Sequence, residues 1–151
     1  MMTRFSLSMR AFTCIALAAC TSDHVLAPRI VSFAGVTLQV DASLWRDFQP
    51  ISPPDGKPLI AILAVRTIDG TPIPPGLTAD SAWIHNGDLV WGAAVVEEQP
   101  RGAGASSFQV VARNGPKWGP GIEVDVVIQV RDATGQRALL QAPRQLIART
   151  D

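Results

Sequence analysis

The sequence is poor in the groups from which most active sites are built. It contains two cysteines, two histidines and no tyrosine, and its three methionines all lie within the first nine residues. Zinc sites need clustered histidine and cysteine, and copper sites draw on methionine and histidine. An Asp-x-Asp-x-Asp loop for calcium is also missing. We therefore expect no metal site and no cofactor.

Hydrolase signatures are missing as well. The chain has no Gly-x-Ser-x-Gly motif, and only His85 of the two histidines falls in a segment expected to fold. Nucleophilic catalysis needs a nucleophile, a base and a group that orients the base. Residues 101–107 are rich in glycine, but a strand pattern follows them where a helix would follow a dinucleotide-binding loop. We expect an exposed loop there, and no enzymatic activity in the chain.

Neither sign of charge is in excess. Thirteen basic residues balance thirteen acidic ones, and the pI is about 6.7. General nucleic-acid binders carry a basic excess, so nucleic acid is not an expected partner.

The first twenty residues have the organisation of an export signal. Arg4 and Arg10 lie near the start with no acidic residue, and residues 5–19 are mostly apolar. This apolar stretch is shorter than the roughly twenty residues that a membrane-spanning helix needs. A positive start, a short apolar run and small residues at its end are typical of a secretory signal peptide.

The segment ends in Leu17, Ala18, Ala19 and Cys20. Here the chain resembles the lipobox of bacterial lipoproteins. The resemblance implies that a lipid is attached to the Cys20 sulfur and that a lipoprotein signal peptidase cleaves between Ala19 and Cys20. Membrane lipid is then the first expected partner. The anchor is expected in the outer membrane where the cell has one, because Thr21 and not aspartate follows the cysteine.

The predicted processing divides the chain into three parts. These are a signal peptide over residues 1–19, a lipidated cysteine and tether over residues 20–29, and one domain over residues 30–151. Cys14 leaves with the signal peptide and Cys20 carries the lipid, so the mature domain has neither a free thiol nor a disulfide. Its stability must come from packing.

The predicted domain has the pattern of short β-strands. Apolar residues occupy alternate positions most clearly over residues 122–130, and residues 59–67 are apolar on both faces, as in a central strand. Further strand-like segments cover residues 36–40, 81–85, 89–97, 108–112, 136–141 and 145–149. After Cys20 no segment has a convincing helical period.

About seven or eight short strands separated by proline and glycine predict an all-β domain. We expect an antiparallel sandwich of immunoglobulin-like class, with Trp83 in the place of the buried tryptophan on a central strand. The usual cysteine pair is absent, so this expectation concerns class and not family. The proline-rich residues 50–58 and 72–76 are expected to form stiff loops that discourage edge pairing.

Tryptophan supplies the candidate ligand-binding residues. If residues 86–88 form a three-residue hairpin loop, Trp83 and Trp91 face each other on neighbouring strands. Such a pair either packs in the core or forms an exposed platform for a sugar or peptide. Trp118, beside Lys117 in a loop rich in glycine and proline, either caps the end of the domain or meets ligand. We take Trp118, Lys117 and Trp91 as the candidate site.

These patterns favour a membrane-anchored, non-catalytic protein whose domain binds or scaffolds an envelope protein or a glycan. One alternative is a carbohydrate-binding module that uses exposed tryptophan. Another is an inhibitor that inserts the stiff loop of residues 72–76 into an envelope protease. An enzyme is the alternative that the sequence favours least.

Overall fold

The domain is built from strands alone, which confirms the predicted all-β class. The computed structural model describes residues 27–151, and within that range it contains eight strands and no helix. In chain order the strands are β1 (Ile30–Phe33), β2 (Val36–Asp47), β3 (Leu59–Thr67), β4 (Thr78–Asn86), β5 (Leu89–Ala94), β6 (Ser107–Gly115), β7 (Glu123–Arg131) and β8 (Arg137–Thr150). Over these residues there is accordingly no helix long and apolar enough to cross a membrane. The predicted cleavage site at Ala19 and Cys20 lies outside the described residues.

One mixed sheet holds all eight strands. Its order is β5-β4-β7-β8-β2-β3-β6, and β1 pairs with β2 off this path. The pairings are antiparallel except that of β8 with β2. The first part of β8 pairs with β7, and residues 147–150 then run parallel to the end of β2. The expectation of a wholly antiparallel arrangement is wrong for this pair.

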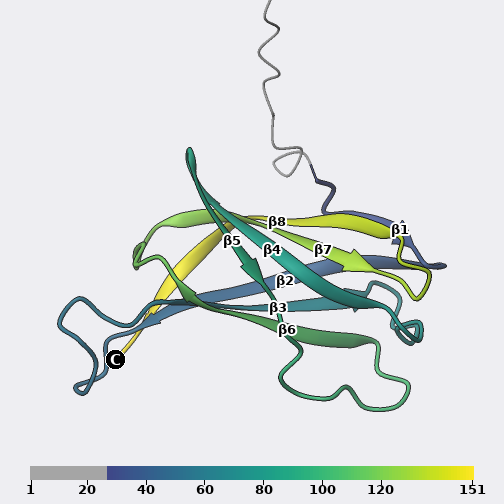
Figure 1. Ribbon diagram of the computed structural model, residues 1–151, viewed down its shortest axis with the longest axis horizontal. Coiled ribbons are helices and arrows are strands. Elements are labelled where there is room, and N and C mark those ends of the chain that lie inside the picture. Colours follow the sequence, from purple (N-terminus) through teal and green to yellow (C-terminus); the bar gives the residue numbers. More distant parts are fainter. Residues whose placement is uncertain (1–26) are drawn as a thin grey trace, which may run out of the picture.

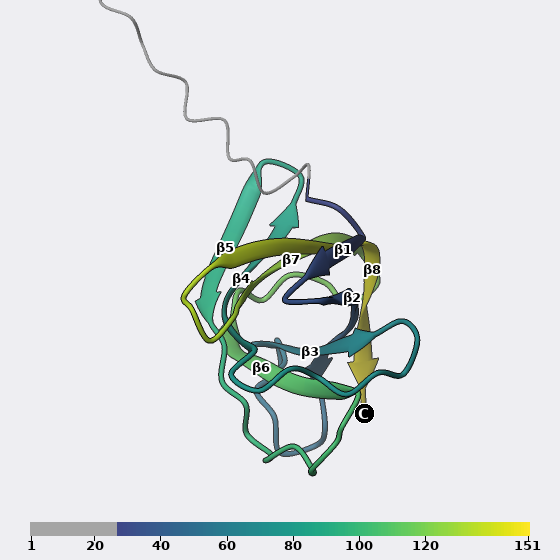
Figure 2. The same cartoon turned by 90° about the vertical axis from the view of Figure 1, so that its right-hand side faces the viewer.

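The sheet curves into a half-barrel around a single core (Figure 1, Figure 2). Just beyond the end of β5, Val96 exchanges two backbone hydrogen bonds with Val111 of β6. The two ends of the strand order are therefore linked by a single bridge. The sandwich and its immunoglobulin-like class stay predictions.

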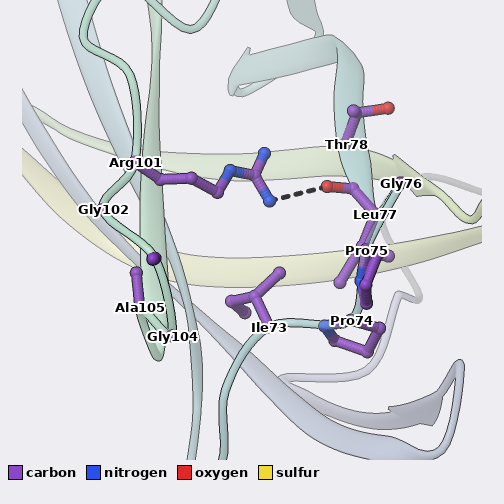
Figure 3. Close-up of a pocket in the computed structure, with 11 residues that line it drawn as sticks. Ile73, Pro74, Pro75, Gly76, Leu77, Thr78, Arg101, Gly102, Gly104 and Ala105 are labelled. Carbon is purple, nitrogen blue, oxygen red and sulfur yellow. Dashed lines mark hydrogen bonds between the residues drawn. The ribbon is translucent and has the colours of Figure 1, made fainter.

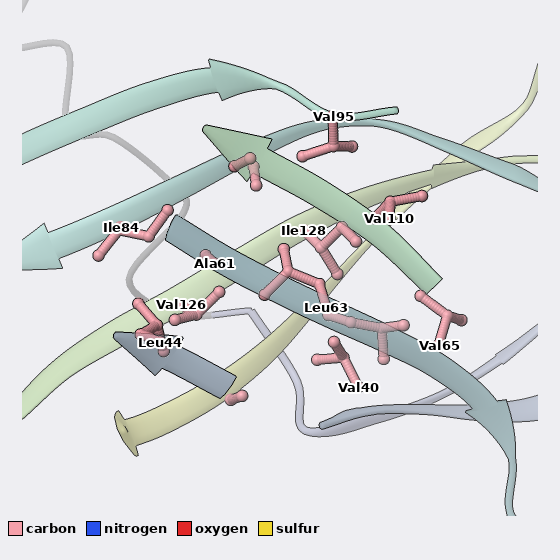
Figure 4. Close-up of a cluster of buried hydrophobic side chains, with 14 of the residues drawn as sticks. Val40, Leu44, Ala61, Leu63, Val65, Ile84, Val95, Val110, Val126 and Ile128 are labelled. Carbon is pink, nitrogen blue, oxygen red and sulfur yellow. The ribbon is translucent and has the colours of Figure 1, made fainter. Parts of the chain in front are cut away.

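Alternating side chains on the inner face form the core (Figure 4). In β7 the alternate residues Val124, Val126, Ile128 and Val130 are buried, as the period of two in the sequence predicts, and Val127 is buried as well. Strand β3 contributes alternate residues in the same way: Leu59, Ala61, Leu63 and Val65.

Strand β8 differs most from the sequence prediction. Residues 136–141 and 145–149, expected as two strands, all belong to the single strand β8 except residue 136. Arg144 has φ of 55°, and the register between β7 and β8 shifts by one residue opposite it. Such a β-bulge bends a strand, and here it lies between the part of β8 that pairs with β7 and the part that pairs with β2.

The hairpin between β4 and β5 has a shorter turn than expected. Asn86 pairs with Leu89, so the turn contains only Gly87 and Asp88. Gly87 has φ of 57°, which suits the first central position of a type II′ turn. The predicted hairpin is confirmed, but its three-residue loop is wrong.

This one-residue difference separates the two tryptophans of the hairpin. Trp83 lies opposite Gly92, and Trp91 lies opposite Ile84. Ile84 is fully buried and Trp91 packs against the core, whereas the half-buried Trp83 lies on the outer face. The expected pairing of Trp83 with Trp91 is therefore wrong, and so is the core role expected for Trp83.

The described chain begins in contact with the sheet. Ala27 is buried, and the carbonyl of Pro28 accepts a hydrogen bond of 2.8 Å from the backbone N–H of Gln141 in β8. The last residues of the predicted tether thus pack on the domain. Residues 21–26 separate Cys20 from Ala27, the first described residue.

Candidate functional site

The residues predicted to bind ligand lie around one loop but do not form an exposed aromatic platform. Trp91 and Trp118 are both half-buried and pack against the core. Trp91 contacts Gly115, where the loop that carries Lys117 and Trp118 begins. Lys117 is exposed, and its ammonium forms an ion pair of 2.6 Å with Asp55.

One buried arginine holds two loops together at this end of the domain. Arg46, with an exposed fraction of 3%, is the last inward-facing residue of β2. Residues 48–58 follow β2 directly and residues 116–122 join β6 to β7; we call these two segments the tied loops. The guanidinium donates to two backbone carbonyls in each loop: from Nε to Lys57 at 2.9 Å, from Nη2 to Asp55, and from Nη1 to Lys117 at 3.1 Å and to Gly119 at 2.8 Å.

These hydrogen bonds explain how a cation is accommodated at a buried position. Burial of a guanidinium is costly unless its donors are satisfied. The acceptors are backbone oxygens, one of them 73 residues away along the chain. Because the guanidinium fork is planar and rigid, it is satisfied only when both loops keep their present arrangement. Arg46 therefore selects one conformation of the tied loops.

Two ion pairs add to this arrangement. The ammonium of Lys117 joins the loops through Asp55, and Lys57 contacts Asp47 at 2.7 Å at the base of the first loop. The hydrogen bond from Lys117 holds the pKa of Asp55 below its ordinary value, and the hydrogen bond from Lys57 does the same for the pKa of Asp47. Both carboxylates are therefore charged at neutral pH. The pair of Lys117 and Asp55 is exposed, and exposed pairs contribute little stability, so its main effect is on loop position.

Phe48 forms the base of the first tied loop. The guanidinium carbons of Arg46 and Arg149 lie 5.0 Å and 4.2 Å from the centre of its ring. Its ring also packs on the backbone of Gly56, where a Cβ atom would lie 2.6 Å from Cζ of the ring. Gly56 has φ of 75°, so both the contact and the backbone conformation require glycine.

The tip of the first tied loop presents a hydrophobic side chain. Ile51 is 88% exposed, more than any other large hydrophobic residue between positions 27 and 151. Prolines at positions 50, 53 and 54 restrict the backbone around it. The N–H of Ser52 donates to the carbonyl of Gln49 at 2.7 Å and closes a turn at the tip. The exposed isoleucine is thus carried by a loop whose conformation is restricted.

A second concave feature lies at the other proline-rich loop. An open cavity of about 570 Å³ separates residues 73–78 from residues 101–105 (Figure 3). Arg101 connects its two walls, since Nη1 donates to the carbonyl of Leu77 at 2.9 Å. The same guanidinium makes two hydrogen bonds to the carboxylate of Glu97, at 2.9 Å and 2.6 Å. The guanidinium of Arg101 is therefore already hydrogen-bonded to groups of the protein itself.

The loop predicted to inhibit a protease, residues 72–76, forms one wall of this cavity. Its Ile73 packs against the core, and the backbone N–H of Ile73 donates to the carbonyl of Ala105 at 2.8 Å. The glycine-rich segment opposite is a loop over residues 101–106, as predicted.

Among residues 27–151, no three histidine, cysteine or acidic side chains lie close enough together to hold a metal ion. His85 is buried on β4, opposite Asp125 of β7.

No protein-family model matches this sequence, and no curated protein is significantly similar to it.

Neither the strand-like segments nor the motifs of the sequence single out Arg46 and Ile51, two residues at this end of the domain. A signal for Arg46 exists, because it occupies the same alternate positions as the buried Leu38, Val40 and Leu44. A charged residue at a core-facing position must find buried partners. Ile51 carries no comparable signal, since its exposure depends on the conformation of its loop.

Proposed function

We propose that this protein is an exported lipoprotein of the bacterial cell envelope, anchored by a lipid on Cys20, whose β domain binds or scaffolds a partner protein and catalyses no reaction. The lipobox resemblance of residues 17–20 supports the anchor. The tied loops support the binding role, and they are the single observation that carries it.

The tied loops have the properties of a preorganised binding surface. Four hydrogen bonds from Arg46 hold them in one arrangement, so a partner that binds there does not have to order them. The group presented at the tip is the side chain of Ile51, which suits an apolar pocket on a protein better than a polar glycan. The indoles of Trp91 and Trp118 are instead engaged in packing against the core.

The position of the first tied loop fits an anchor at the other side of the domain. In Figure 1 and Figure 2 the described chain begins on one side of the sheet, and the loop of residues 48–58 lies on the opposite side. A domain held at the membrane through its N-terminus would therefore turn Ile51 away from the lipid.

The anchor is tested by Cys20→Ala in the full chain, expressed in bacteria fed with radiolabelled palmitate. We expect label on the wild-type protein and none on the variant, which should also keep residues 1–19. Cys14→Ala is the matched control, because that cysteine lies within the predicted signal peptide and should leave labelling unchanged. Label on the Cys20→Ala protein would contradict the anchor.

The binding role is tested by cross-linking intact cells and capturing the tagged protein for mass spectrometry. The test variant is Ile51→Ser, and the control is Ile68→Ser, a second exposed isoleucine in the loop after β3. We expect one recurrent protein partner, recovered about tenfold less with Ile51→Ser, as for the loss of an interface anchor. Equal recovery with both variants would contradict the role of the loop.

The two alternative functions have less support from the contacts. Carbohydrate stacking would need free indole faces at Trp118 and Trp91, which pack against the core. Protease inhibition by residues 72–76 would need side chains directed outward, but Ile73 packs inward. Tryptophan fluorescence during titration with cell-wall glycans separates the first alternative from the proposal, because only glycan binding would shift the emission.

We also propose that the half-barrel is an immunoglobulin-like sandwich. One layer would contain β2, β3 and β6, and the other β5, β4, β7 and the first part of β8. In support, the connections from β3 to β4, from β5 to β6 and from β6 to β7 each pass between these layers, as Greek-key connections do. An experimental structure with the layers about 10 Å apart, face to face, would support this proposal. A continuously curved sheet without two layers would contradict it.

A further inference from the structure

The β4–β5 hairpin ends in exposed hydrophobic side chains. Leu89 and Val90 directly follow the turn and are 58% and 49% exposed. As consecutive strand residues they project to opposite faces of β5. Contact with a folded protein surface would bury only one of these two side chains. An apolar medium that surrounds the tip would bury both.

A third exposed hydrophobic residue lies at the same level of the sheet. His85 pairs with Asp125, so the turn residue Gly87 is level with Glu123, and Glu123 pairs with Leu146. Leu146 is 58% exposed. Two strand spacings, about 10 Å, separate it from the turn. Glu123 itself forms an exposed ion pair of 3.1 Å with Arg144, so the edge of the sheet at this end carries charged side chains as well as the apolar Leu146.

The proposed lipid anchor precedes Ala27, the first described residue, in the chain. Both views place the hairpin tip and the beginning of the described chain on one side of the domain (Figure 1, Figure 2). The carbonyl of Pro28 accepts a hydrogen bond from Gln141 of β8, and Gln141 is level with Trp83 of β4 across β7. The turn at Gly87 lies about 13 Å beyond Trp83 along β4. The eight residue steps from Cys20 to Pro28 span at most about 28 Å. A bilayer that holds Cys20 is thus within reach of the tip.

We propose that the tip of the β4–β5 hairpin, with Leu89 and Val90 at its end and Leu146 beside it, lies in the surface of the same bilayer that holds the lipid on Cys20. This inference rests on the proposed lipid anchor. The exposed carboxylate of Asp88 in the turn keeps the tip at the level of the headgroups and out of the hydrocarbon. Two contacts with one bilayer restrict the orientation of the domain and direct the first tied loop outward.

The test uses the full chain, processed in bacteria and reconstituted in vesicles of phosphatidylethanolamine and phosphatidylglycerol. Leu89→Cys and, separately, Ile51→Cys introduce one thiol each for an environment-sensitive fluorophore. Because Cys20 is alkylated in the proposed mature protein and Cys14 is removed, the introduced thiol is the only one that reacts. Val90→Cys serves as a second probe position if Leu89→Cys does not fold.

We expect the probe at position 89 or 90 to shift its emission to shorter wavelength on reconstitution and to be quenched by nitroxide-labelled lipid. The probe at position 51 should do neither. The inference is overturned if the protein floats with the vesicles while the probes at positions 89 and 90 emit at the same wavelength as they do in water. It is also overturned if the probe at position 51 shifts its emission equally. Failure of the anchor is distinguishable, because the protein then does not float and Cys20 itself takes up the fluorophore.

Discussion

The indole of Trp91 packs directly on the backbone of Gly115. A Cβ atom at position 115 would lie 2.5 Å from Cζ3 of the indole, closer than real Cβ contacts come. The contact joins β5 to the end of β6, near the bridge between Val96 and Val111. It therefore helps to hold together the two ends of the curved sheet.

We predict that Gly115→Ala destabilises the domain through this contact. The added methyl group must displace the Trp91 ring or the strand, and overpacking of this kind costs about 1–3 kcal/mol of unfolding free energy. Thermal unfolding followed by tryptophan fluorescence measures the effect. Gly102→Ala is the matched control, because no atom beyond the neighbouring residues in the chain lies within 4 Å of the Cβ it adds. The packing account is wrong if both variants unfold at the same temperature.

Loss of Arg46 should release the tied loops. Arg46→Met keeps most of the volume but removes the donors to four carbonyls, and we expect a loss of about 2–4 kcal/mol of unfolding free energy. Amide hydrogen exchange should accelerate at Gly56 and Lys57 before the rest of the domain unfolds.

Arg149→Met provides the control for this variant. Arg149 also stacks on the ring of Phe48, but its side chain is half exposed, so its removal should cost less than about 1 kcal/mol. Equal losses for the two arginines would show that the buried hydrogen bonds of Arg46 are not what holds the loops.

Acid should weaken the contact between the tied loops. The hydrogen bond from Lys117 lowers the pKa of Asp55 in the folded state below the 3.8 of a free aspartate. A group with a depressed folded pKa stabilises the fold above its unfolded pKa, and this contribution is lost as pH falls through the folded pKa. The stability difference between wild type and Asp55→Asn should therefore be present at about pH 6 and absent well below pH 3.8.

Denaturant titrations of wild type, Asp55→Asn, Lys117→Met and the double variant measure this dependence. In the Lys117→Met background, the pH-dependent effect of Asp55→Asn should be much smaller, because the largest cause of the lowered pKa of Asp55 is gone and only the weaker effects of its backbone hydrogen bond and of Arg46 remain. A pH dependence that survives undiminished without Lys117 would assign the effect to another group.

The two-residue turn at the end of the β4–β5 hairpin should depend on glycine. Gly87 has φ of 57°, a conformation that costs other L-residues about 1–2 kcal/mol. Gly87→Ala should lower the unfolding free energy by this amount, whereas Asp88→Ala, whose φ is not positive, should change it by less than about 0.5 kcal/mol. If the two variants are equally stable, the turn is not the one described.

Much of the strand pattern is predictable from the sequence, because burial on one face imposes a period of two. Residues 59–67 coincide with β3, and the alternation over residues 122–130 corresponds to β7 within one residue at each end. Register is not predictable in the same way. One residue fewer in the hairpin turn reverses which face each residue of β5 occupies, and the expected pairing of Trp83 with Trp91 is lost for that reason.

The candidate site is harder to predict from the sequence than the strands are, because it depends on contacts between distant segments. Arg46 bonds carbonyls that lie 9 to 73 residues away, and no local pattern indicates which loops meet. The parallel pairing of β8 with β2 is also a contact between distant segments, because it joins the first long strand to the last. No local pattern in the sequence indicates it either. The loop rich in glycine and proline points to Lys117 as a candidate, but its partner Asp55 follows only from the fold.

Site-specific photo-cross-linking in intact cells shows whether the tied loops bind a partner protein. A photoreactive amino acid is placed at position 51, at the tip of the first tied loop, and separately at position 68 as the exposed control. We expect a discrete protein adduct from position 51 that position 68 does not give and that Arg46→Met weakens. If position 51 gives no adduct, or the same adducts as position 68, the tied loops are not a binding surface.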